Sequence, residues 1–429
     1  MESVVSPAGS LRGEIAPPPD KSISHRAVMF ASIAKGESRI KNLLKAADPI
    51  STMNAFRALG VEITESAEEV IIVGKGLYGL REPDDVIDCG NSGTTIRLIT
   101  GLLAGQPFYT TLTGDASLRK RPMGRIIEPL KKMGGRIMAR ADDTLAPVSI
   151  RGGGLKGIHH VSRVASAQVK SSIVLAGLCA EGDTLIEEPQ RSRDHTERML
   201  ISMGADLNVE GLTVRVRGGR ELEPFDITVP GDFSSAAFFI AGALIIPNSE
   251  ITIKDTGINP TRTGLLEAIH LMGGDLNVTE EREVSGELVG NLHARYTKGL
   301  KGIELPAELV PAMIDEFPVF SVIATQAEGE TIIRGASELR VKESDRIATV
   351  VGELRKMGAE IEELPDGMVI NGPTRLKGGR VLSHGDHRLA MSLAVAGLVA
   401  EGETVIEGTE AVDISFPGFF ELLQSVLVK

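Results

Sequence analysis

Basic side chains gather at a few places in the sequence, next to serine, glycine and proline. Lys21 and Arg26 lie in PPDKSISHR, and Arg388 ends the segment HGDHR. Arginine holds carboxylates and phosphates through paired hydrogen bonds, and lysine binds them as a point charge. These clusters predict a site for small anions. The run Arg119–Arg121 taken alone is typical of a solvated face, but the proline and glycine that follow it indicate a shaped loop.

A second basic segment, LRVKESDR at 339–346, adds acidic side chains. A helix through it would place Lys342 and Arg346 on one face, four residues apart, where like charges repel. An anion bound near both would remove that repulsion. Glu343 would point elsewhere and could serve as an acid or a base.

Six predicted helices begin with polar clusters that contain Asp, Ser, Asn or Gly. The clusters lie at 18–26, 89–97, 165–172, 230–237, 314–320 and 384–391. Asp, Ser and Asn cap helix N-termini well, and the N-terminus itself carries partial positive charge and free N–H donors. The helix starts therefore favour anions. Gly93 in NSGT could be a plain turn glycine, but its place at a helix start favours close approach of a ligand.

The polar clusters belong to a repeat. An apolar helix, a small residue with glycine and an alternating strand recur six times, as in FASIAKGESRI and VAGLVAEGETVI. An amphipathic helix that ends in glycine follows at a regular lag, and its glycines are Gly60, Gly134, Gly204, Gly273 and Gly358. Each repeat reads approximately β-α-β-α-β-β.

We therefore predict an α/β repeat fold (α+β) with two globular domains. Each holds three βαβαββ units with inward helices and outer sheets, and a cleft lies between the domains. The predicted domains are 18–229 and, together, 1–17 and 230–429, because the N-terminal AGSLRGEIAPP supplies a segment that the last repeat lacks. A single open array of repeats is the alternative, but capping repeats are not evident.

The amino-acid composition and the absence of certain motifs argue against several classes of function. A net charge of −12 argues against nucleic-acid binding by bulk charge, although focused cations can still attract small anions. The sequence lacks phosphate-loop and dinucleotide-binding glycine motifs and has no cluster with metal-ligand spacing. We expect no metal and no cofactor. The N-terminus does not read as a signal peptide and no apolar run is long enough to span a bilayer, so we expect a cytoplasmic protein with no membrane partner.

The motifs, taken in order, resemble one family. DKSISHR, NSGT, KRPMG, VKESDR and GDHR occur as in 5-enolpyruvylshikimate 3-phosphate synthases, also called 3-phosphoshikimate 1-carboxyvinyltransferases, and the resemblance covers essentially the whole chain. It implies transfer of the carboxyvinyl group of phosphoenolpyruvate to the 5-hydroxyl of shikimate 3-phosphate, with release of phosphate, in aromatic amino-acid (chorismate) biosynthesis. It also implies a monomer that acts on small anionic substrates.

The resemblance also implies roles for single residues. Those expected to bind shikimate 3-phosphate, mostly in 18–229, are Lys21, Ser22, Arg26, Ser166, Gln168, Arg193, Asp315 and Lys342. Those expected to bind phosphoenolpyruvate are Lys21, Gly93, Arg121, Gln168, Arg346 and Arg388. Asp315 should accept the proton of the attacking hydroxyl. Glu343, with Lys21, should protonate the methylene carbon.

The chain departs from many bacterial members at Leu98, where they have proline, and at Ile414, where they have lysine. Gly93 is retained, so we expect inhibition by glyphosate. One alternative is the sister transferase that acts on UDP-N-acetylglucosamine, but its reactive cysteine is missing from 114–121. A non-catalytic scaffold or an RNA-end-processing relative is the other alternative, and either would call for a nucleotide loop or a basic stripe.

Overall fold

The computed structural model describes residues 1–428, which divide into two compact units. Unit 1 comprises Met1–Pro18, Pro230–Glu283 and Leu288–Lys429, and unit 2 comprises Pro19–Val229 and Val284–Glu287. Within the described chain, every helix is too short or too polar to cross a membrane.

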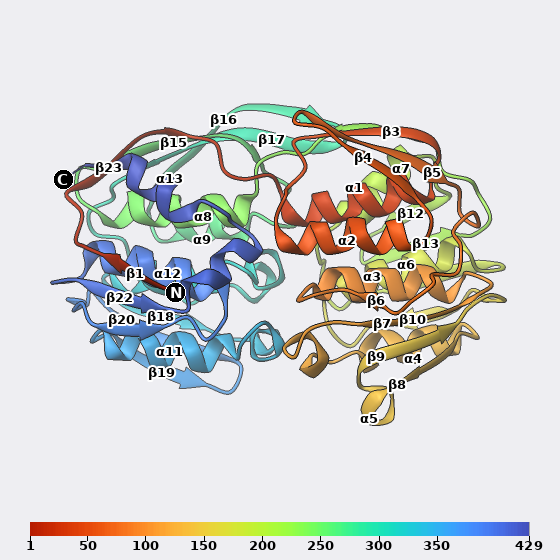
Figure 1. Cartoon of the computed structure of the whole chain (residues 1–429). Coiled ribbons are helices and arrows are strands. Elements are labelled where there is room, and N and C mark those ends of the chain that lie inside the picture. Colours follow the sequence, from red (N-terminus) through yellow and green to blue (C-terminus); the bar gives the residue numbers. More distant parts are fainter. Residues whose placement is uncertain (429) are drawn as a thin grey trace. The chain divides into compact units, whose positions relative to one another are not determined.

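Unit 2 contains three βαβαββ repeats, each with a four-stranded sheet (Figure 1). The first contains α1 (Lys21–Ile33), β3 (Lys35–Lys41), α2 (Ala47–Ala58), β4 (Glu62–Glu65), β5 (Glu69–Lys75) and, from the end of the unit, β14 (Asp226–Thr228). The second contains β6 (Ile87–Asp88), α3 (Gly93–Ala104), β7 (Tyr109–Thr113), η1 (Leu118–Lys120), α4 (Gly124–Lys132), β8 (Arg136–Ala139), α5 (Arg140–Asp143) and β9 (Leu145–Arg151). The third contains β10 (His159–Val161), α6 (Ala167–Leu178), β11 (Asp183–Glu187), α7 (His195–Ser202), β12 (Leu207–Glu210) and β13 (Thr213–Arg217). In each sheet one edge pair is parallel and the other pairs are antiparallel.

Unit 1 repeats the plan with sheets of five, three and three strands, two of which include strands from the N-terminus. Its first repeat contains β2 (Ser10–Ile15), α8 (Phe233–Ile245), β15 (Glu250–Gly257), α9 (Gly264–Leu271), β16 (Asp275–Val284) and β17 (Glu287–Arg295). The second contains η2 (Ala307–Leu309), η3 (Pro311–Met313), α10 (Phe317–Thr325), β18 (Gly329–Ile333), η4 (Ser337–Val341), α11 (Arg346–Lys356), β19 (Glu360–Leu364) and β20 (Gly367–Gly372). The third contains β21 (Arg380–Leu382), α12 (His387–Val399), β22 (Thr404–Glu407), η5 (Thr409–Ile414), α13 (Phe419–Val426) and β23 (Leu427–Val428). The N-terminal β1 (Glu2–Val5) pairs with β22, and β2 pairs in parallel with β15.

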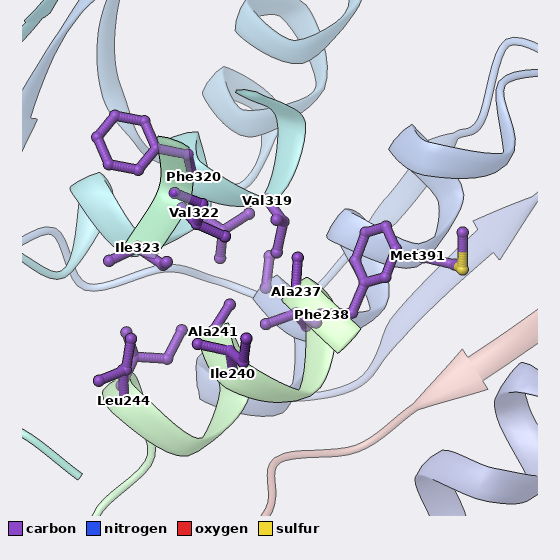
Figure 2. Packing of buried hydrophobic residues seen from close by; sticks show 14 of the residues in the cluster. Ala237, Phe238, Ile240, Ala241, Leu244, Val319, Phe320, Val322, Ile323 and Met391 are labelled. Atoms are coloured by element: carbon purple, nitrogen blue, oxygen red, sulfur yellow. The ribbon is translucent and has the colours of Figure 1, made fainter. Parts of the chain in front are cut away.

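Three helices in each unit are buried on almost all sides and fill its centre. Every residue of α8 and α10 is buried, and α1, α3, α6 and α12 are nearly as enclosed. Figure 2 shows Ala241 and Leu244 of α8 beside Val322 and Ile323 of α10 in the core of unit 1. The strands alternate, as in β9, where every second side chain is buried. The predicted α/β repeat class with inward helices is confirmed.

Glycines end the amphipathic helices as predicted. Gly60, Gly134, Gly204, Gly273 and Gly358 follow α2, α4, α7, α9 and α11 with φ angles of 89°, 98°, 82°, 78° and 89°. A glycine in this conformation stops a helix at little steric cost. The following chain then turns directly into a strand of the outer sheet.

Glycine also permits the closest helix contact in unit 2. A Cβ built on Gly101 of α3 would lie 2.0 Å from the carbonyl oxygen of Ser172 on α6. We expect Gly101→Ala to lower the free energy of unfolding by about 1–3 kcal/mol in urea denaturation, because the two helices must move apart.

Gly352→Ala in α11 is the matched control, because a Cβ at Gly352 meets no atom within 4 Å. It should leave stability unchanged or raise it by up to about 1 kcal/mol, since alanine is the better helix former. Equal losses in the two variants would contradict the close packing of α3 on α6.

Candidate functional site

The six predicted helix starts are confirmed. In unit 2, α1, α3 and α6 follow the N-cap residues Asp20, Ser92 and Ser166, and in unit 1, α8, α10 and α12 follow Asp232, Glu316 and Asp386. Asp20 Oδ1 accepts a hydrogen bond from the Ile23 amide at 2.8 Å, and Ser92 Oγ accepts one from the Thr95 amide at 3.1 Å. These caps fix the helices at the residues where the candidate side chains begin.

Arg26 joins the helix starts of unit 2. Its guanidinium donates to Thr196 Oγ1 on α7 at 2.7 Å and to Ser171 Oγ on α6 at 3.1 Å, and the side chain is 3% exposed. Burial lowers the pKa of Arg26 to about 10, with Glu197 and Asp20 opposing that fall and Arg193 adding to it. Arg26 is therefore still charged at neutral pH.

Two further arginines converge on the start of α3. Arg97 Nη1 donates to Gln168 Oε1 at 2.5 Å, and Arg121 Nη2 donates to Asn91 Oδ1 at 2.5 Å. A Cβ built on Gly93 would lie 2.9 Å from Arg97 Nη1 and 3.3 Å from Arg121 Nη1. The hydrogen atom of glycine is what lets both guanidinium groups lie here. Together with the positive end of α3 they form a strong candidate anion site.

The other unit 2 candidates surround these helix starts. Lys21 is the first residue of α1, and its Nζ lies 3.4 Å from Asp48 Oδ2. Ser22 follows it, and Arg26 donates to the Ser22 carbonyl oxygen at 3.0 Å. Ser166 is the N-cap of α6, but its side chain makes no capping hydrogen bond. Unit 2 thus holds Lys21, Ser22, Arg26, Gly93, Arg121, Ser166, Gln168 and Arg193.

The unit 1 candidates form one ion-pair cluster around Arg346. Its guanidinium lies 2.7 Å from Glu343, 2.8 Å from Asp386 and 3.1 Å from Asp315. Burial disfavours the charge on Arg346, but these three carboxylates outweigh burial and raise its pKa. Arg388 Nη2 lies 3.6 Å from Asp315 Oδ2, so Asp315 contacts two arginines.

Asp386 is the fully buried member of this cluster. It caps α12 by accepting from the Arg388 amide at 2.9 Å. Burial opposes its charge, but the Arg346 guanidinium outweighs burial and lowers the pKa of Asp386. Unit 1 thus brings together Asp315, Glu343, Arg346 and Arg388, with Lys342 directly before Glu343 in the chain.

Two expectations for the segment 342–346 are wrong. Lys342 has extended backbone angles (φ −82°, ψ −153°) after η4, and α11 begins only at Arg346. Asp345 causes this, because its side chain accepts from the Ala348 amide at 3.1 Å as an N-cap. Lys342 and Arg346 therefore do not share a helix face. Glu343 does not point elsewhere but contacts Arg346.

Sequence reasoning missed several residues of the site. Asp386 lies in the segment 384–391, which the sequence identifies as a helix start. No neighbouring residue in the sequence indicates that Asp386 pairs with Arg346. Asn91, which holds Arg121, in turn donates to Asp115 Oδ2 at 2.6 Å. Leu98, one of the departures, is wholly buried in the core, and Ile414 ends η5. Within residues 1–428, no three His, Cys, Asp or Glu side chains are grouped so as to hold a metal ion.

Comparisons with known proteins agree over nearly the full length. A family model described as EPSP synthase (3-phosphoshikimate 1-carboxyvinyltransferase) matches residues 5–423. Proteins named 3-phosphoshikimate 1-carboxyvinyltransferase from Thermodesulfovibrio yellowstonii and Geobacter metallireducens are 55% and 54% identical, and each match covers 99% of both chains. A solved structure of EPSP synthase from Acinetobacter baumannii has a TM-score of 0.88 at 45% identity, with 100% of this chain and 98% of that chain covered.

The buried pair of Asp386 and Arg346 gives a pH-dependent prediction. Asp386→Asn should lower the free energy of unfolding at pH 7 by about 3–5 kcal/mol, because a buried guanidinium loses a charged partner. A carboxylate with a lowered folded-state pKa stabilises above its unfolded pKa of about 3.9, and that stability is lost as pH falls through the folded pKa. The difference from wild type should therefore shrink below about pH 4, as urea denaturation at pH 7 to 2.5 would measure.

Asp413→Asn, at an exposed carboxylate of η5, is the control and should follow the wild-type curve throughout. A loss in Asp386→Asn that stays constant down to pH 2.5 would mean that Asp386 is not the ionised partner of Arg346.

Proposed function

Because this chain belongs to the EPSP synthase (3-phosphoshikimate 1-carboxyvinyltransferase) family, we propose that the residues at its helix starts carry out the family's reaction. The enzyme transfers the carboxyvinyl group of phosphoenolpyruvate to the 5-hydroxyl of shikimate 3-phosphate and releases phosphate. It is a transferase of the shikimate pathway. The observation that carries the assignment of residues is the convergence of Arg97 and Arg121 on Gly93 at the start of α3.

Residues of unit 2 bind the acceptor, shikimate 3-phosphate. The N-caps support this, because unit 2 has one carboxylate and two hydroxyl caps, whereas unit 1 has three carboxylates. Fewer negative charges at the helix ends favour an added anion. The residues proposed to hold this substrate in unit 2 are Lys21, Ser22, Arg26, Ser166, Gln168 and Arg193.

Phosphoenolpyruvate carries a phosphate and a carboxylate, and arginine pairs well with both. The residues proposed to bind it are Lys21, Gly93, Arg121, Gln168, Arg346 and Arg388. Ion pairing with carboxylates already holds the guanidinium of Arg346 in place. Such preorganised charge stabilises the phosphate as it departs.

Asp315 and Glu343 divide the proton transfers. Glu343, with Lys21, protonates the methylene carbon of phosphoenolpyruvate. The 5-oxygen of the acceptor attacks the neighbouring carbon while Asp315 takes the hydroxyl proton, and a tetrahedral intermediate forms. Loss of a methyl proton and cleavage of the carbon–oxygen bond to phosphate then give the enol ether. Lys342 contacts the acceptor near Asp315.

The protein is also proposed to work as a cytoplasmic monomer on small anionic substrates, without nucleic acid, metal or cofactor. Membership in a biosynthetic enzyme family supports this proposal. Light scattering on a sizing column tests the oligomeric state, where a mass near 45.6 kDa is expected.

The first activity prediction concerns Asp315. Wild-type protein should release phosphate when given shikimate 3-phosphate and phosphoenolpyruvate, and no phosphate with UDP-N-acetylglucosamine as acceptor. Asp315→Asn should lower kcat by about 10²–10⁴-fold, because a general base is lost. Asp413→Asn is the control. Undiminished turnover in Asp315→Asn would remove Asp315 from the mechanism.

The second activity prediction concerns Gly93. Its added Cβ in Gly93→Ala must displace the ends of Arg97 and Arg121. We expect the KM for phosphoenolpyruvate and the inhibition constant for glyphosate each to rise about tenfold or more, because a displaced guanidinium loses a charged hydrogen bond to the anion worth about 1.5–3 kcal/mol.

Gly124→Ala is the matched control, because a Cβ there meets its nearest atom at 3.7 Å, which is ordinary contact. It should leave both constants unchanged. Wild-type turnover that persists in millimolar glyphosate would refute the expected inhibition.

A further inference from the structure

Four buried polar side chains form a continuous hydrogen-bonded chain behind the helix starts of unit 2. His25 Nδ1 lies 2.7 Å from Thr52 Oγ1, which lies 2.7 Å from Thr95 Oγ1, which donates to Ser92 Oγ at 2.7 Å. All four side chains are 0% exposed. We call them the His25–Ser92 chain. Water cannot replace any of these bonds without opening the core.

Which group donates in each of these hydrogen bonds follows from the number of hydrogens that the hydroxyl groups carry. Each hydroxyl carries one hydrogen, and Thr95 uses its own on Ser92. Thr52 must therefore donate to Thr95, and His25 must donate from Nδ1 to Thr52. His25 is then a neutral imidazole with a bare Nε2, which has no hydrogen-bond partner among the described residues. Burial, with Lys21 and Arg26 adding to it, holds the pKa of His25 well below its ordinary value, which agrees with the neutral form.

Through α2, the chain links α1 and α3, the two helices that carry the proposed substrate-binding residues Lys21 and Gly93. His25 lies one turn after Lys21 on α1, and Thr52 lies one turn after Asp48 on α2. The ion pair of Lys21 with Asp48 and the hydrogen bond of His25 with Thr52 therefore join α1 to α2 at successive turns. At its other end the chain reaches Ser92, the N-cap next to Gly93.

We infer that His25, Thr52 and Thr95 are positioning residues that fix Lys21 on α1 relative to Gly93 on α3; this rests on the substrate-binding roles proposed above. Apolar residues of similar size could fill the same space without the need to pair every polar atom. Hydrogen bonds are directional, whereas apolar contacts are not. The hydrogen bonds of this chain therefore fix the position of one helix start relative to the other. Catalytic groups must be held within a fraction of an ångström for full rate.

Steady-state kinetics on hydroxyl variants test the inference. Thr52→Val and Thr95→Val keep the branched shape but break the chain, and we expect kcat to fall about 10–100-fold, as for a small misplacement of reacting groups. Thr52→Ser and Thr95→Ser restore the hydroxyl and should recover most of the rate. Thr100→Val is the control, because Thr100 is equally buried on α3 but bonds the Ile96 carbonyl oxygen of its own helix at 2.6 Å.

The double variant Thr52→Val, Thr95→Val separates positioning from general destabilisation. A chain already broken at one bond loses little at the second, so the double variant should be no slower than the slower single variant, whereas independent losses would multiply. Melting temperatures show whether each variant stays folded at the assay temperature; Thr52→Val should melt below Thr100→Val, because it deprives two buried polar groups of a partner. If Thr52→Val does not fold, the comparison of Thr95→Val with Thr95→Ser decides.

Nitrogen-15 spectra of labelled histidine provide a readout independent of turnover. His25 should show a protonated Nδ1 and a bare Nε2 at neutral pH, and the Nδ1 proton should exchange faster with solvent in Thr52→Val. Multiplicative rate losses, full activity in both valine variants, or the opposite tautomer would overturn the inference. Failure of the proposed function is distinguishable, because then wild-type protein itself would release no phosphate while the spectra still reported on the chain.

Discussion

Side-chain hydrogen bonds join helix starts within each unit, such as Gln168 with Thr94 in unit 2 and Ser234 with Glu316 in unit 1, and each start carries partial positive charge. The two units differ in how they balance that charge. Unit 1 places a carboxylate at each start, namely Asp232, Glu316 and Asp386. At these positions unit 2 has one carboxylate, Asp20, and two serines, of which Ser92 caps its helix and Ser166 makes no capping hydrogen bond. The same backbone plan therefore gives two different electrostatic environments, with fewer negative charges at the helix starts of unit 2.

The carboxylates at the helix starts of unit 1 have a second effect, because two of them, Asp232 and Asp386, also pair with arginines. Asp386 caps α12 and still pairs with Arg346, and Asp315 pairs with Arg346 and Arg388. A buried guanidinium is costly without such partners. The network thus keeps Arg346 charged and fixes its direction. The groups that stabilise this charge, Asp386 and Asp315, lie at or next to the helix starts.

The fold was predictable from the sequence because its signals are local. Glycine after five amphipathic helices and Asp or Ser at most of the N-caps mark where helices end and begin, and the six-fold repetition multiplies each signal. The exception is instructive. Lys342 and Arg346 were expected on one helix face, but Asp345 competes for the Ala348 amide and delays the helix. Contacts such as Arg26 with Thr196, 170 residues apart, have no local signal. The roles of single residues came from resemblance to a family, not from spacing.

Comparison of the repeats also explains why one helix start holds none of the predicted site residues. The start of α8 has the same design as the others, yet none of the predicted site residues lies there. Asp232 of that start accepts from the buried Arg262 at 2.7 Å, and Ser234 bonds both Arg262 and Glu316. The negative charge of Asp232 is therefore balanced by Arg262 inside the core. At the start of α3, Gly93 has no side chain to fill the corresponding space, and the guanidinium groups of Arg97 and Arg121 lie there instead. The side chains at corresponding positions of one backbone plan thus decide whether a helix start is bonded inside the core, as at α8, or left open to converging arginines, as at α3.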